Sequence, residues 1–221
     1  ESGGLMRTAV VGLITNEPFE LAAEIAAITH GHPSAFLSAA VVAEIIRKLL
    51  SGNSLIDSIE HTLYEELPNH EGYEEILSVC HRALSLAKMQ TRDIGTGTND
   101  VSTLELELRE LKDLEIPSHR SVEWIGKGWV AEETLAIALY CSVVYSNDFR
   151  SGLELSINHS GNSNGVGALT GNILGTWLGI ESVPDTWLQR LELKDVIHTV
   201  SRDLYSSFIE ATGWEDRYPG H

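Results

Sequence analysis

The sequence predicts an all-α fold, and three features of the chain support this prediction. Apolar residues recur every three or four positions along most of the chain, as they do on one face of a helix. No stretch alternates apolar and polar residues for long enough to indicate a strand. The segments between the periodic stretches are short, so we expect a single compact multi-helix domain over residues 1–221.

The first clear helix is predicted between Pro33 and Gly52. Its apolar stripe has four-residue spacing and consists of Leu37, Val41, Ile45 and Leu49. Further helical patterns occupy residues 54–67, 71–88, 131–145, 151–158, 165–178 and 193–209. Residues 96–100 are expected to form a loop, and residues 104–114 either a short acidic helix or a mobile connection.

The composition limits the classes of partner. With 43% hydrophobic and 21% charged residues, a chain of 221 residues can bury a sizeable core. Its 15 basic and 32 acidic residues give a formal net charge of -17. That charge repels nucleic acid and acidic membrane surfaces, so we expect neither as a partner. A small anionic ligand stays compatible, because helix N-termini and backbone N–H groups bind phosphate without a basic surface.

The cysteines and the apolar runs indicate the compartment. Cys80 and Cys141 lie in apolar or helical surroundings and are interpreted as two buried thiols in a reducing compartment, with a single disulfide as the alternative. The longest mostly apolar run, residues 35–46, is interrupted by Ser38 and Glu44. This interruption argues against a membrane span and a signal peptide, so we expect a cytoplasmic protein.

Residues 158–175 combine polar and glycine residues in a pattern that suggests a binding function. A polar loop continues into a predicted helix that carries Gly167, Gly171 and Gly175 on one face. Such a stripe lets a second helix approach the backbone closely, and it does the same for a ligand. Both interpretations stay open from the spacing alone.

Residues 158–179, together with Pro184, Trp187 and residues 191–197, resemble the C-terminal signature of the ADP-ribosylglycohydrolases. Three further blocks are similar to blocks of that family in the same order, at residues 3–7, 29–34 and 126–133. The resemblance covers nearly the whole chain. It implies an all-helical fold of the ADP-ribosylglycohydrolase type. Enzymes of this type hydrolyse ADP-ribose linkages with two magnesium ions held in a central cleft.

The metal-binding positions depart from that family as a group. The family loop carries Asp-x-Asp followed by Ser or Thr, and this chain instead has Asn162, Asn164, Gly165 and Val166. Two neighbouring magnesium ions need anionic oxygen ligands, and an asparagine offers an oxygen without charge. Ser160 beside His159 lacks the motif of an activated nucleophile. We therefore expect no intact metal site, no cofactor and no catalytic residue in this chain.

The family's other metal ligands come from a Thr-Asp-Asp segment that precedes the block at residues 3–7. This chain contains no adjacent pair of aspartates, so we expect it to lack the N-terminal part of the fold. Ser2 stands where the family places an asparagine between glycines. Gly3 and Gly4 follow it and are expected to present backbone N–H groups to a ligand.

We expect ligand contacts on four segments of the chain, at the following residues: Ser2, Gly3, Gly4, His30, Gly128, Trp129, Ser160 and Gly161. The resemblance places His30 near bound ADP-ribose, whereas His32 is expected to cap and pack the helix that follows. Gly128 and Trp129 are expected to flank a ribose or an adenine. The alternative for Trp129 is that its indole anchors the following helix in the core.

Three roles stay open at this point. In the favoured one, the chain is catalytically inactive and retains binding of an ADP-ribose-like small molecule. In the second, it is the larger part of a split ADP-ribosyl hydrolase that needs an N-terminal partner chain. In the third, it is a structural or interaction protein that docks a protein partner, or a second copy of itself, over the face that the missing N-terminal part leaves exposed.

Overall fold

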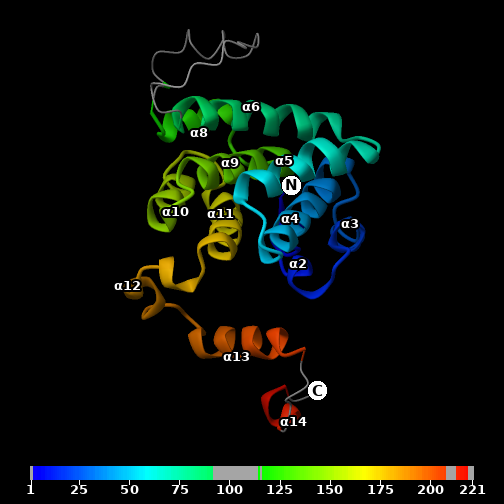
Figure 1. Cartoon of the computed structure of the whole chain (residues 1–221), viewed down its shortest axis with the longest axis vertical. Helices are drawn as coiled ribbons and strands as arrows, with labels where there is room; N and C mark the ends of the chain where they lie inside the picture. The colour runs from blue at the N-terminus through cyan, green and yellow to red at the C-terminus, as the bar shows by residue number, and fades with distance from the viewer. Residues whose placement is uncertain (1, 92–113, 115, 208–212, 219–221) are drawn as a thin grey trace. The chain divides into compact units, whose positions relative to one another are not determined.

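The computed structural model describes residues 2–91, 114, 116–207 and 213–218, and within these ranges every regular element is a helix (Figure 1). This confirms the predicted all-α class. The chain divides into two compact units, Glu1–Ser182 and Val183–His221. The assignment of residues 1–221 to one domain stays a prediction. The loop expected at residues 96–100 lies outside the described residues. The element expected at residues 104–114 also lies outside them, except for Leu114, which is buried.

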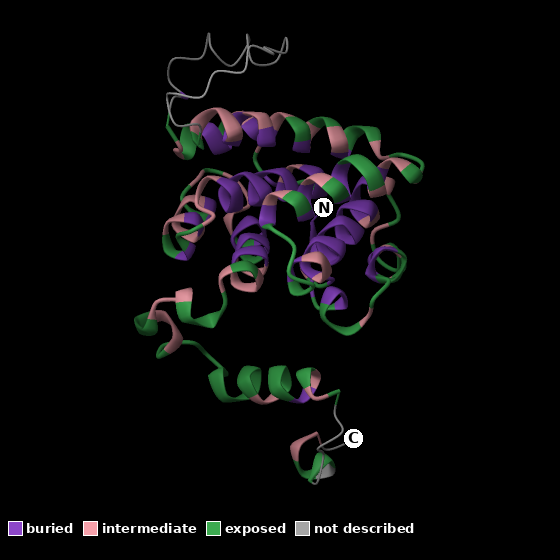
Figure 2. Ribbon diagram, in the orientation of Figure 1, coloured by how far each residue is buried: buried purple, intermediate pink, exposed green. Residues whose placement is uncertain are grey.

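Helices α4 (Pro33–Leu50) and α9 (Ala131–Val144) form the centre of the first unit. Helix α9 contacts α6 (Glu74–Thr91) and α11 (Ser163–Leu178), and α4 contacts α3 (Pro18–Ala27). Figure 2 shows that α4 and α9 are buried along most of their length. Beyond its first turn α9 has no charged residue, and a helix that is apolar on all sides is stable only when surrounded.

The ends of α4 explain why the helix lies where the sequence predicts it. His32 precedes the helix, and its Nδ1 accepts a hydrogen bond of 3.3 Å from the backbone N–H of Ser34. Pro33 occupies the first turn, where a missing N–H has no cost. The chain leaves the helix through Gly52, whose φ of +87° favours glycine. His32 therefore has the capping role expected for it.

Six shorter helical elements complete most of the first unit: α1 (Gly3–Met6), α2 (Val11–Ile14), α5 (Leu55–His61), α8 (His119–Ile125), α10 (Phe149–Ile157) and the 3₁₀ turn Ile180–Ser182. Helix α5 continues through a π-helical turn, Thr62–Glu66, and a 3₁₀ turn, Leu67–Asn69. The expected helix over residues 54–67 is thus present, and the hydroxyl of Ser54 accepts from the N–H of Asp57 at its start. 

The glycine stripe of α11 faces α10. A Cβ on Gly167 would lie 2.5 Å from Ile157 Cγ2, which is closer than atoms can approach. A Cβ on Gly171 would lie 3.8 Å from Leu153 Cδ1, an ordinary contact. The two helices contact each other along this face. The helix-crossing interpretation of the stripe is therefore the one that the structure supports.

The second unit contains α12 (Asp185–Leu188), α13 (Lys194–Tyr205) and α14 (Trp214–Arg217). The buried carboxylate of Asp203 joins α13 to the chain end, because it accepts bonds from Arg217 Nη1 at 2.8 Å and Tyr218 Oη at 2.9 Å. The helix predicted over residues 193–209 ends at Tyr205, and its last two predicted residues are not described.

The structure bears on two expectations, the state of the cysteines and the presence of a membrane span. Cys80 and Cys141 are both buried and free, as expected from their apolar neighbours, and burial raises the pKa of both thiols. Among the described residues, no helix combines the length and the apolar character needed to cross a bilayer.

Candidate functional site

Asn162, the residue before α11, connects three distant parts of the first unit. Its backbone N–H donates to the carbonyl oxygen of Lys127 at 2.7 Å. Its side-chain Nδ2 donates to the hydroxyl of Ser2 at 3.0 Å, and Ser2 is buried. The N-terminal turn, the loop before α9 and the start of α11 therefore meet at this residue. These are three of the four blocks that carry the family resemblance.

Glycines allow these three segments to approach one another. A Cβ on Gly161 would lie 1.9 Å from the carbonyl oxygen of Lys127, and a Cβ on Gly165 would lie 2.8 Å from Asn162 Nδ2. Gly128 has a φ of +70°, and a Cβ there would lie 2.8 Å from Val166 Cγ2. Side chains at any of these positions would push the segments apart. The glycines predicted as ligand contacts thus have a packing role that is visible without a ligand.

A carboxylate holds the loop before α9 in place. Glu133 Oε2 accepts hydrogen bonds from the backbone N–H groups of Lys127 at 3.0 Å and Gly128 at 2.9 Å. The neighbouring Glu132 points elsewhere: it is buried, and its Oε2 has no hydrogen-bond partner among the described residues. The two carboxylates therefore do not act on a common atom. Glu133 therefore holds the backbone conformation of the loop that contains Gly128 and leads into Trp129.

His30 lies against the glycine pair of the N-terminal turn. Cβ atoms built on Gly3 and Gly4 would lie 3.3 Å from His30 Nε2 and 3.1 Å from His30 Nδ1. On the other side, His30 Nδ1 lies 2.7 Å from the hydroxyl of Thr29, and Arg7 Nη2 donates to the same hydroxyl at 2.6 Å. The structure thus places His30 against Gly3 and Gly4, and a role for these residues in ligand binding stays a prediction.

Ser160 and His159 each bond to a different group. The hydroxyl of Ser160 donates to Glu123 Oε1 at 2.9 Å. His159 Nδ1 accepts from the N–H of Gly161 at 3.1 Å, while its Nε2 is buried without a described partner. Burial lowers the pKa of His159, and the nearby Glu123 acts in the opposite direction. This arrangement orients the loop and does not activate a serine.

Trp129 is 60% exposed. The alternative in which its indole anchors α9 in the core is therefore wrong. The helix start is instead buried through Ala131. The residue sits next to the Gly128 loop with a large apolar surface in water. Its predicted contact with a ribose or an adenine is untested and stays a prediction.

The positions that hold magnesium in the family do not suit that ion here. Asn164 Oδ1 accepts from the N–H of Gly165 at 2.9 Å, and Val166 is fully buried. Gly165 has no side chain, and Asn162, whose Nδ2 donates to Ser2, offers only an uncharged oxygen. Within the described ranges, no group of three or more His, Cys, Asp and Glu residues is arranged to hold a metal. A neutral donor set of this kind does not offset the charge of two divalent cations.

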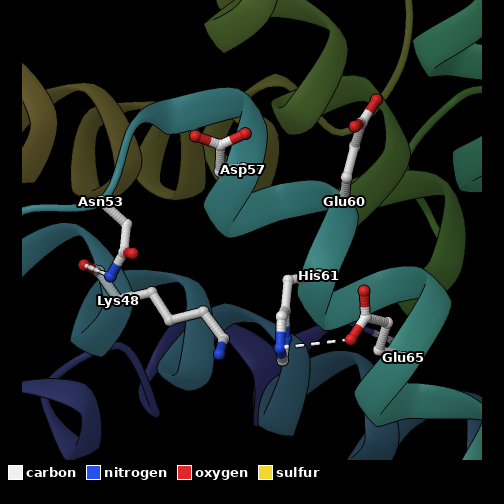
Figure 3. A pocket seen from close by; sticks show the side chains of 6 residues that line it. All are labelled: Lys48, Asn53, Asp57, Glu60, His61 and Glu65. Carbon is white, nitrogen blue, oxygen red and sulfur yellow. Dashed lines mark hydrogen bonds and ion pairs between the residues drawn. The ribbon is translucent and has the colours of Figure 1, made fainter.

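A hollow of about 270 Å³ lies elsewhere in the first unit, and Figure 3 shows its lining residues: Lys48, Asn53, Asp57, Glu60, His61 and Glu65. Its charged groups pair with their neighbours. Lys48 Nζ lies 3.3 Å from Glu44 Oε1, and His61 Nε2 lies 3.5 Å from Glu65 Oε2. Paired and partly exposed charges of this kind are typical of a solvated helix face. We therefore do not include this hollow in the candidate site.

Four residues of the site were not predicted from the sequence to have the roles they show: Arg7, Thr29, Glu123 and Glu133. Each bonds to a predicted residue or to its loop. Their signals in the sequence are weak, because Arg7 and Glu123 lie far along the chain from the groups they bond. Thr29 precedes His30 directly, but a hydroxyl beside a histidine is too common to indicate a bond.

The chain matches the family described as ADP-ribosylglycohydrolase over residues 1–213. It is 25% identical over 225 aligned positions to ADP-ribosylhydrolase ARH3 of Mus musculus, and 24% identical over 222 to that of Homo sapiens. These alignments cover 96% and 94% of this chain and 58% of each relative. The chain therefore spans less than two thirds of the length of these relatives. No solved structure matches the chain significantly.

Proposed function

The chain belongs to the ADP-ribosylglycohydrolase family, and from this membership we propose that it binds ADP-ribose or a related nucleotide without hydrolysing it. The ligand would lie against the three segments that meet at Asn162. The proposed contacts are those expected from the sequence: Ser2, Gly3, Gly4, His30, Gly128, Trp129, Ser160 and Gly161. We also propose that binding needs no cofactor.

The single observation that carries this proposal is the state of Asn162. Its side chain is uncharged and donates to the Ser2 hydroxyl, so the bond joins the N-terminal turn directly to the start of α11. The first turn of α11 contains no acidic residue. A helix N-terminus without carboxylates attracts the negative pyrophosphate of ADP-ribose, whereas two aspartates would repel it unless cations were bound.

Absence of hydrolysis follows from the same residues. Water attack on an ADP-ribose linkage would need an activating group, and Asn162 and Asn164 supply no negative charge to hold a metal that could activate the water. Ser160 donates to the Glu123 carboxylate, and no histidine among the described residues is hydrogen bonded to its hydroxyl. These residues support a site that orients a ligand and leaves its bonds intact.

Calorimetric titration of the purified chain with ADP-ribose, with and without magnesium, tests the proposal. We expect saturable binding whose dissociation constant does not change with magnesium. A parallel assay with an ADP-ribosylated protein should release no ADP-ribose. Binding that requires magnesium, or magnesium-dependent release, would contradict the proposal. If the chain bound no ADP-ribose under either condition, the proposal would also be contradicted, and the family resemblance would then concern the fold alone.

A second function, protein interaction, is favoured by a different face of the first unit. Four apolar side chains there are 45–57% exposed: Val10, Leu13, Ile14 and Leu50. Leu13, Ile14 and Leu50 also line a hollow of about 350 Å³. Polar residues, among them Asn16, Arg47 and Ser51, line the rest of this hollow, and exposed apolar groups with a polar rim often mark an interaction site. Light scattering would detect self-association, and exchange of Leu13 and Ile14 for serine should abolish it while preserving ADP-ribose binding.

We also propose the cytoplasm as the compartment of this protein. The support is that Cys80 and Cys141 are both free and buried, a state that a reducing compartment preserves. Localisation of the tagged chain in cells is the direct test, and a secreted or organellar signal would contradict the proposal.

A further inference from the structure

We propose that the first unit carries a second binding site, separate from the junction at Asn162, and that this site takes an aliphatic polyamine. The site is a hollow of about 450 Å³ between α3, α4 and residues 69–71, which precede α6; we call it the α3–α4 hollow. Its volume lies in the range of small-molecule sites. None of its lining residues belongs to the proposed ADP-ribose contacts, so this proposal does not rest on the proposed function.

Apolar side chains form one part of the lining. Phe36 and Leu37 are neighbours on α4, and of the two Leu37 is buried and Phe36 partly buried. From α3 comes Phe19, whose ring stacks on the imidazole of His70 with 4.4 Å between the ring centroids and 17° between the planes. Methylene groups gain free energy when they leave water for such a surface, and aromatic faces also attract cations. This part of the lining therefore suits an aliphatic chain that carries positive charge.

Three carboxylates belong to the polar part of the lining. Glu20 and Glu24 lie about one turn apart on α3, and Glu71 comes from the third segment. All three residues are exposed, and no lysine or arginine lines the hollow. Within the part of the chain that the structure describes, none of the three forms an ion pair. Their charge is available to a cationic ligand, and the net charge of -17 on the chain adds a long-range attraction.

Asn69 adds an uncharged acceptor to the same hollow. Its Nδ2 donates to the carbonyl oxygens of Glu65 at 2.8 Å and Glu66 at 3.1 Å. These two bonds use the donors of the amide, and its Oδ1 has no hydrogen-bond partner among the described residues. An ammonium group has three N–H donors and no acceptor. The oxygen of Asn69 and the three carboxylates are the complementary groups.

A polyamine fits this combination better than other cations do. Its methylene chain can lie on Phe36 and Leu37 while its ammonium groups pair with carboxylates on two different segments. A metal ion gains nothing from the apolar lining, and no group of three or more His, Cys, Asp and Glu residues in the described ranges is arranged to hold one. A lysine side chain of a partner protein has a similar stem but only one ammonium group, so it would leave carboxylates unpaired.

Calorimetric titration of the purified chain with spermidine, at an ionic strength of about 0.15 M that screens diffuse attraction, tests the proposal. Hexaamminecobalt(III) is the matched probe, because it also carries three positive charges and has no methylene group. We expect saturable binding of one spermidine per chain. It should be about tenfold tighter, or more, than binding of hexaamminecobalt(III), because burial of two methylene groups is enough for that ratio.

Paired variants locate the site on the chain. Glu20→Gln combined with Glu71→Gln removes a carboxylate from each of two segments and should weaken spermidine binding by about tenfold or more, since two charge-assisted contacts are lost. Glu75→Gln combined with Glu181→Gln removes the same charge from exposed glutamates of the first unit that do not line the hollow. This control pair should weaken binding by less than about twofold. Urea unfolding of both pairs shows that they are folded.

Four results would overturn the proposal. The first three are absence of saturable spermidine binding, equal affinity for spermidine and hexaamminecobalt(III), and equal loss of affinity in the two paired variants. Each of these would show that the chain attracts polyamines through its net charge or not at all. The fourth is tighter binding of a trilysine peptide with blocked ends than of spermidine, since the occupant would then be a protein segment. None of these outcomes depends on whether the chain binds ADP-ribose.

Discussion

Asn162 and Ser2 are separated by 160 positions in the sequence, and their side chains are hydrogen bonded at 3.0 Å. The bond ties the N-terminal turn to the start of α11. The backbone of Asn162 is tied at the same time to Lys127 at 2.7 Å. One residue therefore connects three of the four segments of the candidate site. The family resemblance places this residue at a metal-ligand position, and in this chain its Nδ2 donates to Ser2.

The first prediction concerns restoration of the carboxylates. Replacement of both Asn162 and Asn164 by aspartate adds two charges, but Gly165 and Val166 still offer no oxygen side chain. We expect no magnesium-dependent release of ADP-ribose from a modified protein. We expect weaker metal-free binding of ADP-ribose, because two carboxylates repel the pyrophosphate. Calorimetry and a release assay measure the two effects.

The matched control is exchange of Asn172 and Asn158 for aspartate. Both are polar residues of the same region, and neither is a metal-ligand position of the family loop. The control pair adds the same charge, so it reports how much of the loss comes from net charge alone. Turnover by the Asn162 and Asn164 double variant would show that the remaining residues suffice for catalysis and would refute the inactive assignment.

The second prediction compares two glycines of the same segment. In Gly161→Ala the new Cβ would lie 1.9 Å from the Lys127 carbonyl oxygen, so the loop must move. We expect this variant to lower the free energy of unfolding by about 2–3 kcal/mol. In Gly171→Ala the nearest side-chain atom is Leu153 Cδ1 at 3.8 Å, and alanine favours a helix, so stability should rise by about 0.5–1 kcal/mol. Urea unfolding measures both.

The opposite order of stabilities would show that the Lys127 contact is not a constraint on the fold. ADP-ribose affinity gives a second readout for the pair. Gly161 belongs to the candidate site and Gly171 faces α10, so only the first substitution should weaken binding.

The helical fold was largely predictable because its signal is periodic. The stripe from Leu37 to Leu49 and the caps at His32 and Gly52 identify α4 without any tertiary information. The site was only partly predictable. The blocks around His30 and Asn162 could be recognised from the sequence, but their contacts depend on how remote segments meet.

The fate of individual side chains illustrates that limit. Trp129 follows a glycine loop at the start of an apolar helix, a position that suits either core or surface, and only the fold shows that it is exposed. Adjacent Glu132 and Glu133 read alike in the sequence. One is buried with an unpaired oxygen, and the other binds two backbone N–H groups. Such choices are decided by tertiary contacts, which a local pattern does not contain.

The third prediction concerns pH and His159. Burial lowers its pKa below the ordinary value of about 6.5, so the unfolded chain binds the proton first as the pH falls. The contribution of neutral His159 to stability is complete above about pH 6.5 and is lost as the pH falls from there toward the folded-state pKa. Protonation also removes the Nδ1 acceptor that holds the N–H of Gly161.

Urea unfolding near neutral pH and about two pH units lower gives the required difference in free energy. This difference should be smaller in His159→Gln than in the parent chain. An NMR titration in which His159 protonates above the ordinary range would contradict the assigned direction.

The fourth prediction separates binding from stability at Trp129. Because its indole is 60% exposed, Trp129→Ala should change the free energy of unfolding by no more than about 0.5 kcal/mol. If the indole packs on a ribose or an adenine, the same change should weaken ADP-ribose binding by about two- to tenfold. Trp177 provides the reverse case, since its Nε1 donates to the carbonyl of Ser146 at 2.9 Å. Trp177→Phe should therefore lower stability by about 1 kcal/mol and leave affinity intact. Equal affinity in Trp129→Ala and the parent chain would remove Trp129 from the site, and the exposed indole would then belong to a different surface function.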